Sequence, residues 1–141
     1  MSGAEGRPGT IRLGPRQTLT VRSSTPEVLE LECEWQPGTP PPTHWHPRQH
    51  EHFEVLEGEL TVVLAGDERV LRGGDVLDIP PRTAHCMWNA GPGTCRATWL
   101  ITPAQRTEEM FRFMAGDPGP LAKASVLVRF RDELRLGTPR R

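Results

Sequence analysis

The sequence predicts an all-β domain that closes into a barrel or jelly roll and is followed by two short helices. Between residues 11 and 102, short apolar alternations are interrupted about every 8–12 residues by Gly, Pro or Asp, as in sandwiches and barrels. After Thr102 the apolar period becomes helical. The 141 residues suffice for one hydrophobic core and are too few for two domains of ordinary size.

These patterns divide the chain into three parts. Residues 1–10, rich in Gly and polar residues, are expected to be flexible. Residues 11–102 form the β-barrel domain, and residues 103–141 form a helical extension of the same domain.

The clearest strand is expected at residues 28–35, where apolar residues alternate with Glu30, Glu32 and Glu34, so that one face is buried and the other is wet. Further strands are predicted at residues 53–56, 59–64, 69–71, 76–79, 85–89 and 94–101. About eight antiparallel strands in a closed barrel leave few free edges for unwanted pairing.

Two helices are predicted after the barrel. Thr102 as N-cap and Pro103 at the first helical position begin the first helix, which ends near Gly116. Its apolar stripe consists of Met110, Phe111, Phe113 and Met114, which we interpret as packing residues. Apolar spacing over residues 121–134 predicts the second helix. We expect both helices to pack on the outside of the barrel.

Composition excludes several function classes. With 17 Lys+Arg against 18 Asp+Glu, the chain has no bulk attraction to nucleic acid or to a membrane surface. No apolar run approaches the roughly 20 residues of a membrane span, and the start "MSGAEGRPGT" lacks the apolar stretch of a secretory signal. We therefore expect a cytoplasmic protein with reduced cysteines and a small-molecule substrate as its partner.

Residues 43–52, "THWHPRQHEH", hold four of the five histidines. Side chains at i and i+2 of a strand share a face, so His44 and His46 can converge on one ion together with Glu51. His50 and His52, followed by Glu57, repeat the same spacing, so the spacing between ligands alone does not choose between the two sets.

The flanking glycines favour the first set. Gly38 lies six residues before His44, and Gly58 lies seven residues after Glu51, where tight turns must bound the paired strands. We therefore expect His50 and His52 to be surface groups or neighbours of the site.

Two stretches resemble the motifs of the cupin family. "GTPPPTHWHPRQHEHFEVLEG" matches the first motif at all defining positions, which are Gly38, His44, His46, Glu51 and Gly58. "GDVLDIPPRTAHCMWN" matches the second motif through Gly74, Pro80, His85 and Asn89, with Arg82 where the family usually has glycine. The close resemblance covers residues 38–89.

This resemblance implies a small single-domain cupin of the type 2 conserved barrel, with the cupin jelly roll, also called a double-stranded β-helix barrel. It also implies that His44, His46, Glu51 and His85 surround one divalent metal ion. Iron, manganese, nickel, cobalt and zinc all suit three imidazoles and one carboxylate.

The same alternation suggests a substrate pocket. Phe53 and Val55 share the face of Glu51, and Met87 and Asn89 share the side of His85. Apolar core packing is the competing interpretation for the apolar members of this group.

Among cupins, the lack of tyrosine and the presence of Glu51 leave small enzymes with a three-histidine, one-glutamate site, and the tail resembles that of quercetinase-like cupins. We expect a metal-dependent, dioxygenase-like oxidoreductase that acts on a small chelating hydroxy-keto or phenolic substrate, with Glu51 as ligand and base. Two alternatives stay open: a non-oxidative cyclase, isomerase or decarboxylase that uses the metal as a Lewis acid, and a non-catalytic small-molecule binding protein. We also expect a homodimer that pairs through residues 28–35 or through the N-terminal strand.

Overall fold

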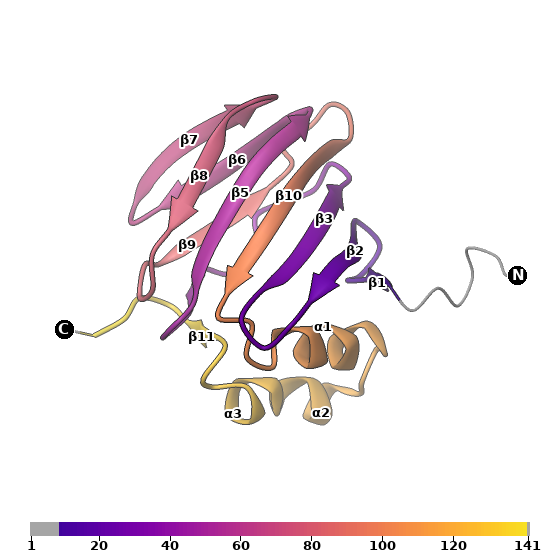
Figure 1. The fold of residues 1–141 in the computed structure, drawn as a ribbon, viewed down its shortest axis with the longest axis vertical. Coiled ribbons are helices and arrows are strands. Elements are labelled where there is room, and N and C mark those ends of the chain that lie inside the picture. The colour runs from indigo at the N-terminus through magenta and orange to yellow at the C-terminus, as the bar shows by residue number, and fades with distance from the viewer. Residues whose placement is uncertain (1–8, 141) are drawn as a thin grey trace, which may run out of the picture.

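The computed structural model describes residues 9–140 and shows two antiparallel sheets that face each other as a cupin-type barrel (Figure 1). In order, the six-stranded sheet contains β1 (Thr10–Arg12), β2 (Gln17–Ser24), β3 (Leu29–Trp35), β10 (Cys95–Thr102), β5 (His50–Glu57) and β8 (Val76–Ile79). The five-stranded sheet contains β11 (Arg135–Leu136), β4 (His44–Trp45), β9 (His85–Trp88), β6 (Glu59–Leu64) and β7 (Asp67–Arg72). The predicted fold class is confirmed.

The inward faces of the two sheets form one core. In β3 the alternation holds residue by residue, because Leu29, Leu31, Cys33 and Trp35 are buried while the glutamates between them point outward. Opposite them, Leu60 and Val62 of β6 are fully buried. Four strands, β1, β2, β4 and β11, were not individually predicted, and residues 1–8 of the expected flexible segment lie outside the described residues.

The position of β3 corrects one expectation about assembly. β3 lies between β2 and β10 and pairs with both, so it has no free edge to offer a second copy of the chain. β1 is an edge strand of its sheet, so the N-terminal strand stays a candidate for pairing with a second copy.

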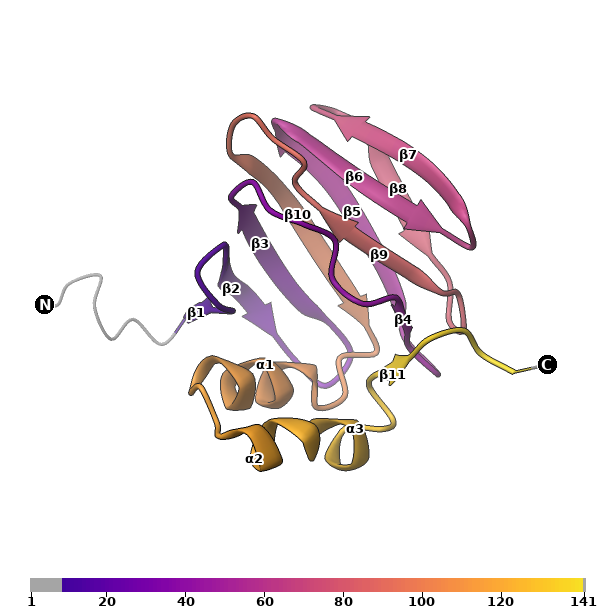
Figure 2. The ribbon, with the colours of Figure 1, turned by 180° about the vertical axis from the view of Figure 1, so that it is seen from behind.

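The helices close one end of the barrel instead of packing on its outer wall. They are α1 (Thr107–Ala115), α2 (Pro120–Ala124) and α3 (Val126–Arg129), and they lie beneath the sheets in Figures 1 and 2. Met110, Phe111, Val126 and Phe130 join the core of the barrel. The expected outside location is therefore wrong: the open barrel end exposes apolar inner faces, and these helices bury them.

Both predicted helix boundaries shift for structural reasons. Thr102 is not an N-cap, because it still belongs to β10 and pairs with His50 of β5, so α1 begins only at Thr107. The second predicted helix is interrupted at Ser125 and ends at Arg129, after which β11 pairs with β4. None of the described helices is long and apolar enough to cross a membrane.

Candidate metal centre

Three histidines from one sheet converge inside the barrel. His44 lies on β4 directly opposite His85 on β9, and His46 follows the end of β4. One nitrogen from each of the three imidazoles lies within 4.8 Å of the other two. This three-histidine cluster could hold a metal ion.

Hydrogen bonds fix the orientation of all three rings. Each Nδ1 faces a backbone carbonyl: His44 that of Pro42 at 3.3 Å, His46 that of Glu133 at 2.6 Å, and His85 that of Thr83 at 2.8 Å. A carbonyl oxygen only accepts hydrogen bonds, so Nδ1 carries the proton in each ring. The three Nε2 lone pairs are then available to a cation, as in histidine ligands held by outer partners.

Glu51 reaches the same space from the opposite sheet. It lies on β5, is 1% exposed, and places Oε1 3.2 Å from Nε2 of His46 and 3.0 Å from Nε2 of His85. Glu51 Oε1 and His46 Nε2 are buried and have no hydrogen-bond partner. Buried polar atoms are rarely left unpaired, and a cation between these atoms would satisfy them, so the residues present fit a bound metal.

The electrostatics of the cluster keep Glu51 ionised and His44 neutral, as a metal requires of these two ligands. Burial alone would raise the pKa of Glu51, but the imidazoles of His46 and His85 outweigh it and lower that pKa well below its usual range. Burial, together with the neighbouring imidazoles, lowers the pKa of His44 to about 4. Burial would also lower the pKa of His46, but the Glu51 carboxylate raises it. At neutral pH the site therefore holds an ionised carboxylate and a neutral His44.

A cavity of about 690 Å³ adjoins the cluster. Its walls include the aromatic rings of Phe53, Trp99 and Phe111, with Phe53 and Trp99 stacked at 5.1 Å between centroids. Met110 and Met114 of α1 also line it, so the predicted helix stripe forms part of the cavity wall as well as packing against the core. Chelating groups at one end and apolar walls elsewhere are typical of small-molecule sites.

The predicted pocket residues separate into two pairs. Phe53 and Met87 line the cavity. Val55 is fully buried in the core and does not line it. Asn89 does not line it either, because β9 ends at Trp88 and the strand alternation stops there.

Asn89 instead stabilises the turn that follows β9. Its amide nitrogen donates to the carbonyls of Trp35 and Gly93, and its side-chain oxygen accepts from the backbone N–H of Gly91.

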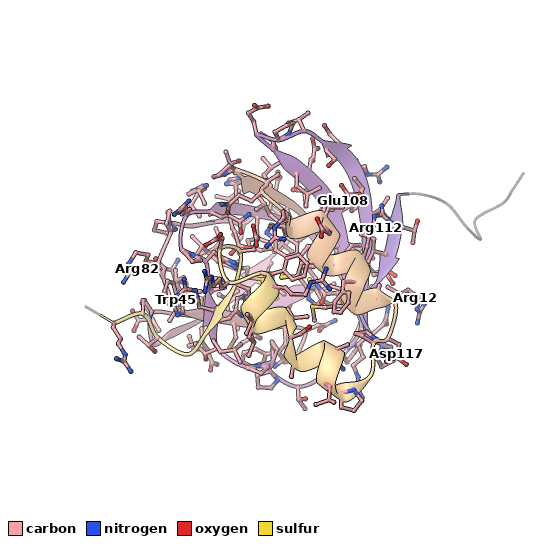
Figure 3. All side chains as sticks on the ribbon, turned by 90° about the horizontal axis from the view of Figure 1, so that it is seen from below. Arg12, Trp45, Arg82, Glu108, Arg112 and Asp117 are labelled. Carbon is pink, nitrogen blue, oxygen red and sulfur yellow. The ribbon has the colours of Figure 1, made fainter. Side chains whose placement is uncertain are left out.

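The other histidines and Arg82 lie away from the cluster. His50 and His52 are on the outer face of β5, where both contact Oδ1 of Asp78, at 3.3 and 2.8 Å. Arg82 has a φ of 61°, a conformation that glycine adopts more readily, which explains why this position usually takes glycine. Its guanidinium lies over the ring of Trp45, 5.0 Å from the centroid (Figure 3).

Sequence reasoning missed three supporting residues. Trp99 donates from Nε1 to Oε2 of Glu51 at 2.9 Å. Gln49, 1% exposed, ties the barrel to the start of α1 through the carbonyls of Pro103 and Ala104. Glu133 supplies the carbonyl that holds His46. The inward alternation of β10 was a signal for Trp99, whereas the partners of Gln49 and Glu133 lie more than 50 residues away and leave no local pattern.

Two antiparallel sheets that face each other form the double-sheet jelly-roll architecture, and in this chain a cluster of three histidines lies inside it. Residues 31–101 match the family model described as "Cupin domain". The chain belongs to the cupin family.

Curated relatives match a part of this chain. The "Probable oxidoreductase yanE" of Aspergillus niger is 44% identical over 59 residues, which cover 40% of this chain and 22% of that protein. An oxidoreductase of Arthrobotrys oligospora is 39% identical over 67 residues, or 46% of this chain and 26% of that protein. The chain thus spans about a quarter of the length of these relatives.

Solved structures show the same fold. KdgF from Halomonas sp. superposes with a TM-score of 0.64 at 22% identity, covering 70% of this chain and 89% of that one. The cupin domain of Cnp3 from Schizosaccharomyces pombe gives 0.59 at 16% identity, covering 70% of this chain and 72% of that one. At such identities the likeness concerns the fold alone.

Proposed function

We propose that this cupin is a metal-dependent, dioxygenase-like oxidoreductase, similar to quercetinases, that acts on a small chelating hydroxy-keto or phenolic substrate. The observation that carries the proposal is the convergence of three imidazole Nε2 atoms with the unpartnered Oε1 of Glu51 at the inner end of an apolar cavity. Over the matched segments, the relatives named oxidoreductases are in agreement with it.

In this proposal His44, His46, His85 and Glu51 hold one divalent ion. Three neutral imidazoles and one carboxylate leave such an ion with a net charge near +1, and iron, manganese, nickel, cobalt and zinc all accept this ligand set. When bound, the ion supplies a Lewis acid and, for the redox-active metals, an electron-transfer centre with open coordination positions.

The protein's own residues would orient and deprotonate the substrate. Phe53 and Trp99 offer a stacked aromatic wall beside the cluster, against which a flat phenolic ring can pack. Glu51 is ionised at neutral pH and lies where it can accept a proton from a hydroxyl group brought to the cluster.

Two measurements test the proposal together. The metal content of natively expressed protein is determined by elemental analysis, and oxygen uptake is followed with 3-hydroxyflavone as substrate, with the chelator-treated protein as control. We expect about one transition-metal ion per chain and oxygen uptake that is lost on chelation and restored by that metal.

Other outcomes contradict the proposal in distinguishable ways. Turnover that needs metal but proceeds without oxygen would favour the non-oxidative cyclase, isomerase or decarboxylase. Metal-loaded protein that binds chelating compounds without turning any of them over would favour the binding protein.

A further inference from the structure

The mouth of the cavity is defined by its solvent-exposed lining residues. These are Pro41 and Pro42 in the loop after β3, Leu127 and Leu136 in the C-terminal segment, and Lys123 on α2. Glu51 and His85, each 1% exposed, lie at the inner end. A ligand that reaches the histidine cluster therefore enters next to the loop after β3 and the C-terminal segment; in Figure 2 this loop leads into β4, which lies beside β11.

Lys123 is unusual among the basic residues. It is the single lysine in a chain with 17 Lys+Arg, and of the described residues that line the cavity it alone carries a fixed positive charge. Several arginines form ion pairs, such as Arg22 and Arg96 with Glu32. The ammonium group of Lys123 has neither an ion pair nor a side-chain hydrogen bond within residues 9–140.

The cavity thus has two polar ends separated by apolar walls. The inner end presents chelating groups, the exposed rim carries one unpaired cation on Lys123, and the buried walls include Met110, Phe111 and Val126. A negative charge near the rim is attracted by the ammonium, whereas a negative charge against the apolar walls loses its hydration without a partner.

We propose that Lys123 binds an anionic group, a carboxylate, at the end of the substrate that lies farthest from the histidine cluster. The substrate class is then an amphipathic acid with chelating oxygens at one end, an apolar or aromatic body and a carboxylate at the other end. The chelating half of this description rests on the proposed function. The carboxylate half rests on Lys123.

The test compares two probes that differ only in the distal charge: 3-hydroxyflavone and its analogue with a carboxylate at the 4′ position, remote from the hydroxy-keto pair. Dissociation constants are measured from probe fluorescence with metal-loaded protein. We expect the carboxylated probe to bind about twofold to fivefold more tightly to the wild type, as for an exposed ion pair, and the preference to shrink at high salt.

Three variants make the assignment specific. Lys123→Met, of similar length, should abolish the preference, and Lys123→Arg should retain it. Arg69→Met removes the same charge from β7, outside the cavity, and should leave the preference unchanged. Equal binding of both probes to the wild type, or a preference that persists in Lys123→Met, would overturn the inference.

The same measurements distinguish a failure of the proposed function from a failure of the carboxylate site. If the Lys123-dependent preference appears equally in chelator-treated protein, the metal-binding part fails while the carboxylate site stands. If neither probe binds the metal-loaded protein, both proposals fail for this ligand class.

Discussion

The indole Nε1 of Trp99 donates a hydrogen bond of 2.9 Å to Oε2 of Glu51, and this bond leaves Oε1 directed at His46 and His85. The two residues come from neighbouring strands, β10 and β5, of the six-stranded sheet. The aromatic wall of the cavity and the carboxylate of the candidate metal centre are therefore one connected unit.

Replacing Trp99 with phenylalanine tests this connection. Trp99→Phe keeps an aromatic ring beside Phe53 but removes the donor to Glu51, so the carboxylate can rotate. We expect metal affinity to fall about tenfold to a hundredfold, the usual cost of losing an outer partner of a ligand. Competition titration with a chromogenic chelator measures it. Trp88→Phe, on β9 and outside the cavity lining, is the control and should leave the affinity unchanged.

The assignment of histidines to the ion predicts a contrast between two alanine variants. His85→Ala removes a buried imidazole of the cluster, whereas His52→Ala removes one from the outer face of the sheet. Metal should be lost from the first and retained by the second. A metal at a hundredfold excess over its dissociation constant stabilises a protein by about 2.7 kcal/mol, so added metal should raise the melting temperature of wild type and His52→Ala only. Full metal retention by His85→Ala would contradict the site.

Much of the barrel was predictable because strand alternation is a local signal, whereas the histidine set was chosen by the flanking glycines and by the resemblance to the cupin motifs, which also supplied His85. Strand alternation assigns each side chain to a face, and the interval between His44 and His46 lies within that pattern. The errors arise where distant contacts decide. Thr102 looks like an N-cap in isolation, but it is held in β10 by its pairing with His50. The helices cap the barrel because Phe111 and Phe130 bury apolar surface at an end whose existence depends on closure of the whole barrel.

The C-terminal segment should influence the metal centre through Glu133. Its backbone carbonyl holds His46, and its side chain, 3% exposed, accepts from the backbone N–H of Arg106 at 3.3 Å. Glu133→Ala should cost about 1 kcal/mol of unfolding free energy, because the backbone N–H of Arg106 loses the carboxylate that accepts its hydrogen bond. Without this anchor, the backbone carbonyl of residue 133 should hold the His46 ring less firmly, and metal affinity should fall. Asp132→Ala changes an exposed neighbouring acid and is the control. Unchanged metal affinity in Glu133→Ala would show that His46 does not depend on this segment.

The outer face of β3 predicts a pH-dependent contribution to stability. Hydrogen bonds from Arg22 and Arg96 lower the pKa of Glu32 below its usual value. A carboxyl with a lowered folded-state pKa stabilises the fold above its unfolded pKa, about 4.3, and this contribution is lost as the pH falls through the folded pKa. Glu32→Gln should therefore be less stable than wild type at pH 7 and equal to it near pH 2. Urea denaturation at several pH values measures the difference.

Glu34→Gln provides the control for that comparison. Glu34 lies on the same strand and forms no ion pair within the described residues. Its replacement should change stability little at any pH, and a loss as large as that of Glu32→Gln would assign the effect to net charge instead of to the two arginines.

Gly58, the turn residue that helped to select the ligand set, should be intolerant of a side chain. Its φ is +79°, and a Cβ there would overlap the carbonyl oxygen of Thr94 and lie 2.9 Å from Cα of Cys95. Gly66 also has a positive φ, +91°, but nothing lies within 4 Å of a Cβ at that position. Gly66→Ala should therefore lower the free energy of unfolding by only about 1–2 kcal/mol, the strain of an alanine in the left-handed conformation. Gly58→Ala adds the clash with the backbone of Thr94 and Cys95, so its urea midpoint should be clearly lower than that of Gly66→Ala. Equal midpoints for the two variants would show that the strands can separate at this turn.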